Sequence, residues 1–233
     1  MQKKNFSTEL AWLIGIIVLA LGVVFMERAD FGMSMVVAPA YILYLKLSEV
    51  FPFVTFGMME YVLQALLLLG MTVILRKWRF VWLFSFVTAV LYGLILDGER
   101  WLLLDVLSDA LWCRALWFVC GLVCCSVAIS LLFQAYFMPE VYELLVKVLA
   151  EERKAPVSRV KTIYDCISCA VSVVLSFCFF GLWQFRGVNW GTVVCALVNG
   201  ILIGGITKLL ERRFVFVDAL PLRGFFAGRA ERV

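Results

Sequence analysis

Six long apolar stretches constrain what this chain can fold into more than any other feature of its sequence. Each holds about 20 residues with few charges or none, which is the length an α-helix needs to cross a bilayer. Apolar residues make up 64% of the chain, whereas an ordinary soluble domain has about 45–50%. We therefore predict an all-α integral membrane protein with six transmembrane helices and no separate soluble domain. The stretches are residues 8–26, 56–75, 80–97, 112–133, 162–183 and 190–207.

Two shorter apolar stretches, 34–50 and 138–150, are interrupted by polar residues. Pro39, Lys46 and Glu49 interrupt the first. The second contains Pro139, Glu140, Glu143 and Lys147. We expect each stretch to form an additional amphipathic or re-entrant helix.

The lysines and arginines predict how the spans are oriented. Short cytoplasmic loops retain basic residues, whereas translocated loops tend to lack them. With six spans and the N-terminus inside, sixteen of the 21 basic residues fall on the cytoplasmic side. If 34–50 also spanned the membrane, residues 76–79 (RKWR) would move outside, so eight spans are the less favoured alternative. The five outer basic residues would be Arg28, Lys46, Arg100, Arg114 and Arg186.

This charge pattern also predicts location and partners. We expect a multi-pass protein of the plasma membrane with both termini in the cytoplasm, whose basic loops contact anionic lipid headgroups of the bilayer. The first apolar stretch resembles a signal peptide, but no small-x-small cleavage site follows it, so we expect a retained span. Nucleic-acid binding is not expected, because the basic residues are dispersed among membrane loops without a recognition motif. Whether the protein forms a homo-oligomer is left open.

Several landmarks recur at almost one spacing along the chain, which suggests an internal repeat. Because equivalent positions are three spans apart, the second copy would be inverted in the membrane. We predict a first three-span repeat at 1–105, a second at 106–213, and a cytoplasmic, partly disordered tail at 214–233. Chance similarity between apolar helices is the alternative. The paired landmarks are Ala29 and Phe31 with Ala135 and Phe137, Pro52 with Pro156, Glu60 with Asp165, and residues 89–93 with 196–200.

Glu60 and Asp165 are the leading candidates for a functional pair. An acid inside the bilayer is costly, and it commonly marks a proton or ion pathway. We therefore place both on a substrate or ion path, one reachable from each face. The alternative is that each acid lies close to an interface and only stabilises the N-terminus of its own helix.

A second candidate cluster follows the first span. Arg28 and Asp30 precede Gly32, a residue that permits unusual backbone turns, and Ser34 follows it. The cluster could line the outer mouth of a path, although a local salt-bridge set with Glu27 is the simpler interpretation. Elsewhere, we expect Arg114 to extend to the interface.

Cysteine and glycine positions favour packing over chemistry. The eight cysteines lie between Cys113 and Cys195, and the chain has no histidine. Cys166-x-x-Cys169 lacks the partners of a zinc or redox site, so we expect no metal and no cofactor. Gly200-x-x-x-Gly204 has the spacing of a close helix-packing face, and a helix break that lines a cavity at Gly204 and Gly205 is the less favoured alternative.

The chain carries none of the common catalytic motifs, including nucleotide-binding loops, His-Glu-x-x-His and G-x-S-x-G. We therefore do not expect an enzyme. An intramembrane enzyme that uses paired acids is only a third hypothesis.

Three short motifs resemble the YczE/YyaS/YitT-type bacterial membrane proteins. They are Ala29-x-x-Gly32-x-Ser34 after the first span, Thr55-x-Gly57 at the next, and Lys161 with Asp165 in the fifth. The resemblance extends over residues 10–210. The chain departs from that pattern with Met35 after the serine, and its second copy lacks the glycine. The resemblance implies a small transporter-like or exporter-like protein and places Lys161 near the path.

Two functions of different class follow from these observations. The first is a small secondary transporter or exporter of an unidentified small solute, with its path between the inverted repeats. The second is an accessory or scaffold protein that binds a partner or lipids and moves nothing. The inverted repeat and the paired acids favour transport, whereas the lack of a charge clearly at the centre of any span favours the accessory protein. A polar cavity that reaches the midplane between the halves would favour transport further, whereas a dry interface filled by Leu and Phe would favour the scaffold.

Overall fold

One long helix, one short helix and two further long helices follow one another in this order twice along the chain. The computed structural model describes residues 4–108, 110–181 and 186–221. Within these ranges the chain forms eight α-helices and two short strands. In chain order they are β1 (Lys4–Ser7), α1 (Thr8–Ala29), α2 (Ala38–Ser48), α3 (Phe56–Leu75), α4 (Trp82–Leu103), α5 (Leu111–Gln134), α6 (Val141–Glu152), α7 (Val157–Phe180), α8 (Trp190–Arg213) and β2 (Phe214–Val217).

Six helices are long and apolar enough to cross a membrane, as the sequence predicted. Their ends differ from the prediction where charged residues were taken as boundaries. Helix α4 continues past Asp97, whose carboxylate accepts hydrogen bonds from Thr55 and from the Gly57 backbone of α3. At the end of α8, Arg212 and Arg213 occupy the last turn, where basic side chains interact favourably with the helix dipole.

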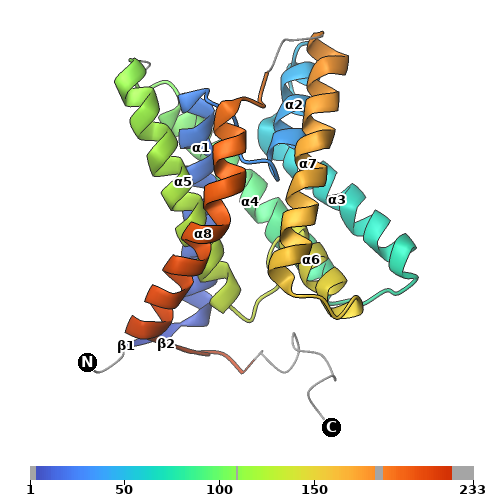
Figure 1. Ribbon diagram of the computed structural model, residues 1–233, viewed down its shortest axis with the longest axis vertical. Helices are drawn as coiled ribbons and strands as arrows, with labels where there is room; N and C mark the ends of the chain where they lie inside the picture. The colour runs from blue at the N-terminus through green and yellow to red at the C-terminus, as the bar shows by residue number, and fades with distance from the viewer. Residues whose placement is uncertain (1–3, 109, 182–185, 222–233) are drawn as a thin grey trace.

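The two short helices do not span. With 11 and 12 residues, α2 and α6 are only about 16–18 Å long, against a hydrocarbon core of about 30 Å. Helix α2 begins at the buried Ala38 and is followed by exposed residues. Helix α6 begins at the buried Val141 and ends in exposed residues. They lie toward opposite ends of the molecule (Figure 1). This is the geometry of re-entrant helices, and it removes the eight-span alternative.

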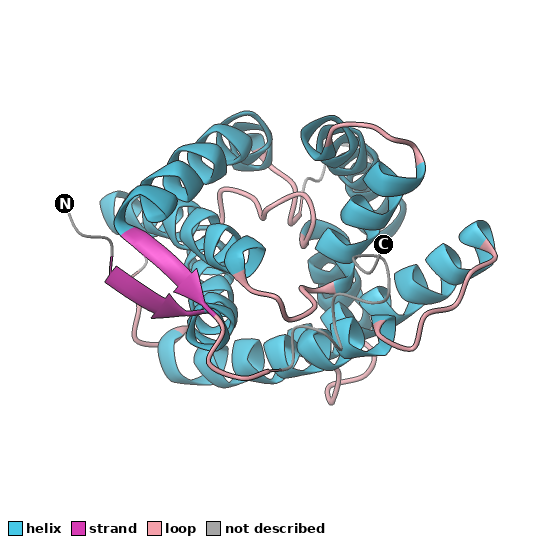
Figure 2. Ribbon diagram, turned by 90° about the horizontal axis from the view of Figure 1, so that it is seen from below, coloured by secondary structure: helices cyan, strands magenta, loops and turns pink. Residues whose placement is uncertain are grey.

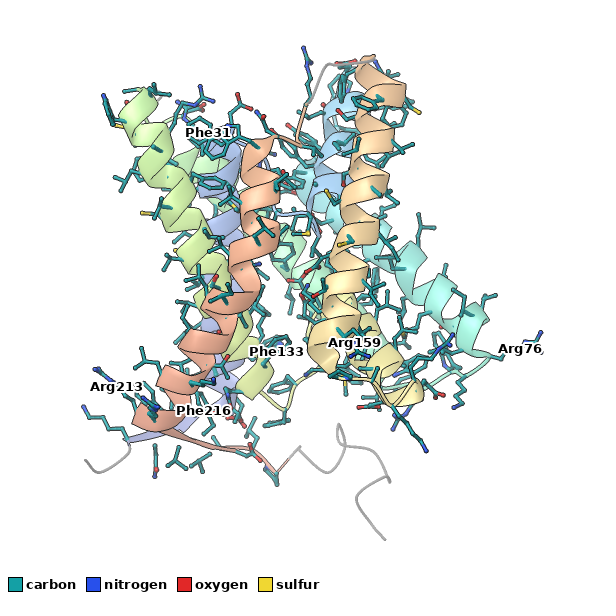
Figure 3. The ribbon with its side chains drawn as sticks, viewed as in Figure 1. Phe31, Arg76, Phe133, Arg159, Arg213 and Phe216 are labelled. Atoms are coloured by element: carbon teal, nitrogen blue, oxygen red, sulfur yellow. The ribbon has the colours of Figure 1, made fainter. Side chains whose placement is uncertain are left out.

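The spans alternate in direction as the charge pattern predicted. Arg76, Arg159 and Arg213 lie at one end of the molecule, whereas Phe31, just after α1, lies at the other (Figure 3). We call these the basic end and the Phe31 end. Helix α1 runs from the basic end to the Phe31 end, and α5 runs back beside it (Figure 1). That the basic end faces the cytoplasm stays a prediction.

Close contact between α1 and α5 organises the core. A Cβ atom on Gly22 would lie 2.7 Å from Cys125 Sγ, and one on Gly121 would lie 2.7 Å from the Gly22 carbonyl oxygen. Because these glycines lack side chains, the two backbones approach closely, as is common between membrane helices. Helix α4 packs on α1, and α8 packs on α5. We call α1, α4, α5 and α8 the first bundle.

The remaining helices form a second bundle. Helix α2 packs between α3 and α7, and α6 also packs between α3 and α7. Each bundle therefore contains helices from both predicted repeats. The two bundles face each other along α3–α4 and along α7–α8 (Figure 1).

The tail begins differently from the prediction. Residues 214–217 were expected to be part of a partly disordered segment, but they form β2, which pairs in parallel with β1 beside the helix ends (Figure 2). Phe6 packs edge-on against Phe214 and Phe216. Glu9 accepts hydrogen bonds from the backbone of Ala219 and Leu220. The described ends of the chain are thus held together at the basic end. The predicted tail beyond residue 221 lies outside the described residues.

Candidate functional site

A cavity of about 380 Å³ lies between α7 and α8. Helix α6 and the last turn of α5 complete its walls, and Met35 is contributed by the segment between α1 and α2. Phe133 of the lining lies toward the basic end, as does Arg159, two residues before Lys161 (Figure 3). The cavity therefore separates the two bundles, and it does not separate the two predicted repeats. Its lining is Met35, Phe133, Glu143, Val146, Lys147, Lys161, Thr162, Asp165, Cys166, Ala196, Gly200, Ile203 and Gly204.

The wall formed by α6 and α7 carries charges of both signs. Lys161 Nζ lies 3.2 Å from Asp165 Oδ1 and 3.8 Å from Glu143 Oε1. Lys147 Nζ lies over the Phe133 ring, 5.3 Å from its centroid. The cavity thus offers both carboxylates and ammonium groups to whatever enters it.

A layer of buried polar side chains lies behind this wall, between α3 and the start of α6. Tyr142 donates a hydrogen bond of 2.9 Å to Glu60 Oε2. Gln64 Nε2 donates one of 2.9 Å to Glu140 Oε2, while Gln64 Oε1 accepts the Val141 N–H at 3.0 Å. Glu60 and Gln64 follow each other by one helical turn, so both face α6. All five residues are almost completely buried.

Two carboxylate oxygens in this layer are unpaired. Glu60 Oε1 and Glu140 Oε1 are buried and have no hydrogen-bond partner among the described residues. Most buried polar atoms in proteins are hydrogen-bonded, so each exception calls for a physical explanation.

Helices α3 and α4 are in close contact, whereas the corresponding helices α7 and α8 are separated by the cavity. A Cβ atom on Gly93 would lie 2.8 Å from the Gly57 carbonyl oxygen. Asp97 of α4 accepts hydrogen bonds from Thr55 Oγ1 at 2.6 Å and from the Gly57 N–H at 2.9 Å, which fixes the start of α3. These contacts hold the first turn of α3 directly against α4.

The predicted packing role of Gly200 and Gly204 is wrong. No atom outside their own turn of α8 lies within 4 Å of a Cβ placed on either glycine, and both line the cavity. Gly200 is the predicted repeat counterpart of Gly93, which does pack closely. The spacing rule failed because it cannot tell a glycine that meets a helix from one that faces a cavity.

Three of the predicted site residues gather around α6. Lys161 and Asp165 line the cavity, and Glu60 lies behind it, bonded to Tyr142. The two acids were expected to be reachable from opposite faces, but both contact α6 or a residue bound to it. The reason is that α6 packs between α3 and α7.

The other predicted site residues lie toward the Phe31 end. Arg28 donates to the Leu107 carbonyl, and Asp30 pairs with Arg114 at 3.1 Å. Arg114 also donates to the Ala29 carbonyl and therefore caps the end of α1. That it extends to the membrane interface stays a prediction. Gly32 has a φ of 111°, and a Cβ there would lie 2.6 Å from Thr192 Oγ1. The Ser34 carbonyl accepts the N–H groups that begin α2.

Sequence reasoning missed two features of the interior. Glu140 and Glu143 were noticed only as interruptions of an apolar stretch, because their burial depends on α6 turning inward. The ion pair between Glu27 and Arg100 was also missed. Arg100 Nε and Nη2 contact both Glu27 oxygens at 2.6 and 2.7 Å, and Nη2 also donates to Tyr44 at 3.0 Å. Seventy-three residues separate the partners, so no local pattern reveals them.

Comparisons with known proteins place the chain in a family. The chain was matched against curated proteins and solved structures, and neither comparison found a similar protein. A family model described as a family of unknown function (DUF6198) matches residues 6–208. That match includes all eight helices apart from the last turns of α8. The chain therefore belongs to this family of unknown function, DUF6198.

Proposed function

We propose that the protein is a small secondary transporter that moves a small solute between its two bundles. One observation carries the proposal. The bundles meet at two matching places, α3–α4 and α7–α8, of which one is tightly closed and the other holds a charged cavity. A transporter that exposes its site to one side at a time needs such a difference.

The packing of the helices supports an inverted repeat. Such a repeat would allow the closed interface to open while the open interface closes. Helix α1 packs on α4 as α5 packs on α8, and α2 packs on α7 as α6 packs on α3. In transporters built from inverted repeats, rocking of one bundle against the other closes one interface and opens its counterpart. In the exchanged state α7 and α8 would meet, and α3 and α4 would separate toward the Phe31 end.

The charges of the cavity indicate the class of solute. Lys147 and Lys161 would attract an anionic group, and Glu143 and Asp165 a cationic one. A volume of about 380 Å³ lies at the lower end of small-molecule pockets, which are about 300–1,000 Å³. We infer a small zwitterionic solute of the amino-acid type. The resemblance to YczE/YyaS/YitT-type proteins, a plasma-membrane location and a cytoplasmic basic end are part of the same proposal.

A scaffold is the alternative, but the cavity does not favour it. A protein that only holds a partner or lipids gains nothing from charges buried between its bundles, since burying them costs free energy. A dry interface filled by leucine and phenylalanine would have favoured the scaffold.

Uptake into liposomes tests the proposal. Purified protein in liposomes is given a mixture of radiolabelled L-amino acids, with the outer solution more acidic than the inner. We expect uptake above that of protein-free liposomes. Asp165→Asn should lower it by about tenfold or more, because one charged interaction contributes about 1.5–3 kcal/mol.

The matched control is Glu211→Gln. Glu211 is an exposed acid that accepts a hydrogen bond from Gln134 and is not part of the cavity lining, so uptake by this variant should equal that of the native protein. Uptake no greater than in protein-free liposomes would contradict the proposal.

A further inference from the structure

Glu60 of α3 and Glu140 at the start of α6 are buried acids in the same polar layer. Within the described ranges, neither Glu60 nor Glu140 forms an ion pair with a lysine or arginine. Glu60 is 0% exposed and Glu140 is 2% exposed. Each keeps one unpaired buried oxygen, Oε1, as described above. An ionised carboxylate in such surroundings is strongly disfavoured unless a positive ligand neutralises it.

The surrounding groups suit a proton better than a metal ion. Gln64 directs its N–H group at Glu140, and its only oxygen already accepts the Val141 N–H. Tyr142 likewise directs its hydroxyl hydrogen at Glu60. Both side chains therefore meet the carboxylates as hydrogen-bond donors, whereas a metal ion would be met by oxygen lone pairs. In the described part of the chain, no group of three or more Cys, Asp or Glu residues is placed to hold a metal.

We propose that Glu60 and Glu140 form an exchangeable proton-binding site between α3 and the start of α6. A hydronium ion transfers its proton to the unpaired Oε1 of either acid. One O–H bond of the hydronium ion breaks, one O–H bond forms on the carboxylate, a water molecule is released and one negative charge is neutralised. The site differs from the solute cavity, because neither acid is part of the cavity lining.

Glu143 connects this site with the cavity. It lies three residues after Glu140, on the same side of the first turn of α6, and it belongs to the cavity lining. A proton that enters the cavity can therefore reach Glu140 through Glu143. The titratable groups that face the two acids from the packed helices are Tyr92 of α4, Cys125 of α5, Tyr142 and Glu143 of α6, and Lys161 and Tyr164 of α7.

Loss of the proton would loosen α6. With both acids ionised, like charges from α3 and α6 would face each other in a medium of low dielectric constant, where their repulsion is strong. The start of α6 would then move away from α3, and Glu143 and Lys147 would move with it. If the proposed transport function is right, this movement couples proton binding to the solute cavity. The proton site itself does not depend on that function.

Infrared spectroscopy of the purified protein in lipid tests the site without any solute. Protonated carboxyl groups absorb separately from carboxylates, so their band can be followed while pH is raised. We expect a band that is present in acid and lost in alkaline solution. Glu60→Gln and Glu140→Gln should each weaken it, whereas the exposed Glu211→Gln should leave it unchanged.

A further variant covers the case in which these glutamines prevent folding. Tyr142→Phe removes one hydrogen bond that favours ionised Glu60. It should raise the pH at which the band disappears by about one unit or more. A band that persists at every pH, one that is absent at every pH, or one that none of the three variants alters would overturn the proposal. Because no solute is present, a protein that passes this test and fails the uptake test refutes transport alone.

Discussion

Replacing Arg100 with methionine is expected to lower the free energy of unfolding by about 3–5 kcal/mol, because it leaves the Glu27 carboxylate buried without its partner. The side chains of Arg100 and Glu27 are 14% and 7% exposed, and they form a bidentate ion pair. Arg100 also lies over the rings of Tyr44 and Phe56. One side chain thus joins α1, α2, α4 and the start of α3. Thermal unfolding in detergent measures the loss.

The double variant separates the ion pair from simple packing. Glu27→Met combined with Arg100→Met removes both charges, and pairs of this kind are often replaced by apolar residues at little cost. We expect the double variant to recover most of the stability. Lys77→Met, which breaks the exposed pair with Glu152, should cost no more than about 1 kcal/mol. A double variant no more stable than Arg100→Met would contradict the explanation.

Leucine at Gly93 and leucine at Gly200 are expected to have opposite effects. At Gly93 the added side chain would collide with the Gly57 backbone, so α3 and α4 must separate. Overpacking of this kind costs about 1–3 kcal/mol and occasionally more. At Gly200 nothing lies within 4 Å, and leucine favours a helix over glycine by almost 1 kcal/mol. This variant should be as stable as the native protein.

Uptake should distinguish the two variants further. The leucine at Gly200 projects into the cavity, so that variant should fold normally and lose most of its uptake. Unfolding temperature and liposome uptake, measured on both proteins, check the prediction. Equal stability of the two variants would show that the α3–α4 and α7–α8 interfaces do not differ as described. Full uptake by Gly200→Leu would mean that the cavity is not on the path.

Apolar periodicity and loop charge were sufficient to predict the spans. Stretches of about 20 apolar residues have few alternatives in a membrane, so all six helices were found. The grouping of Arg76, Arg159 and Arg213 at one end followed from the same loops. The direction of α2 and α6 could not be predicted, because a short interrupted stretch is compatible with a surface helix, a re-entrant helix or a span.

The sequence predicted only those site residues whose type and position are unusual on their own. Glu60 and Asp165 attracted attention because acids within spans are costly. Glu140 and Glu143 lie outside any span, so the same rule does not select them. Their burial results from the inward course of residues 135–140, where Ser85 and Thr88 of α4 donate hydrogen bonds to the carbonyls of Pro139 and Met138. Such contacts join residues that are 50 or more positions apart.

The grouping of helices into bundles was equally beyond the sequence. The repeat suggested that the path separates residues 1–105 from 106–213. In the structure each bundle takes helices from both copies, because α2 packs on α7 and α6 packs on α3. Sequence landmarks show which segments correspond, but not which of them pack together.

Spin-label distances at two matched helix pairs test the central claim most directly. Val62 and Leu102 are exposed on α3 and α4, and Ile167 and Leu209 are exposed at the corresponding places on α7 and α8. After removal of the native cysteines, double electron–electron resonance measures each pair. If the two interfaces open in turn, each pair should show a short and a long distance. A change of pH that increases the population of the long distance at one pair should decrease it at the other. A single distance at each pair that pH does not alter would contradict exchange, and the scaffold would then be the better account.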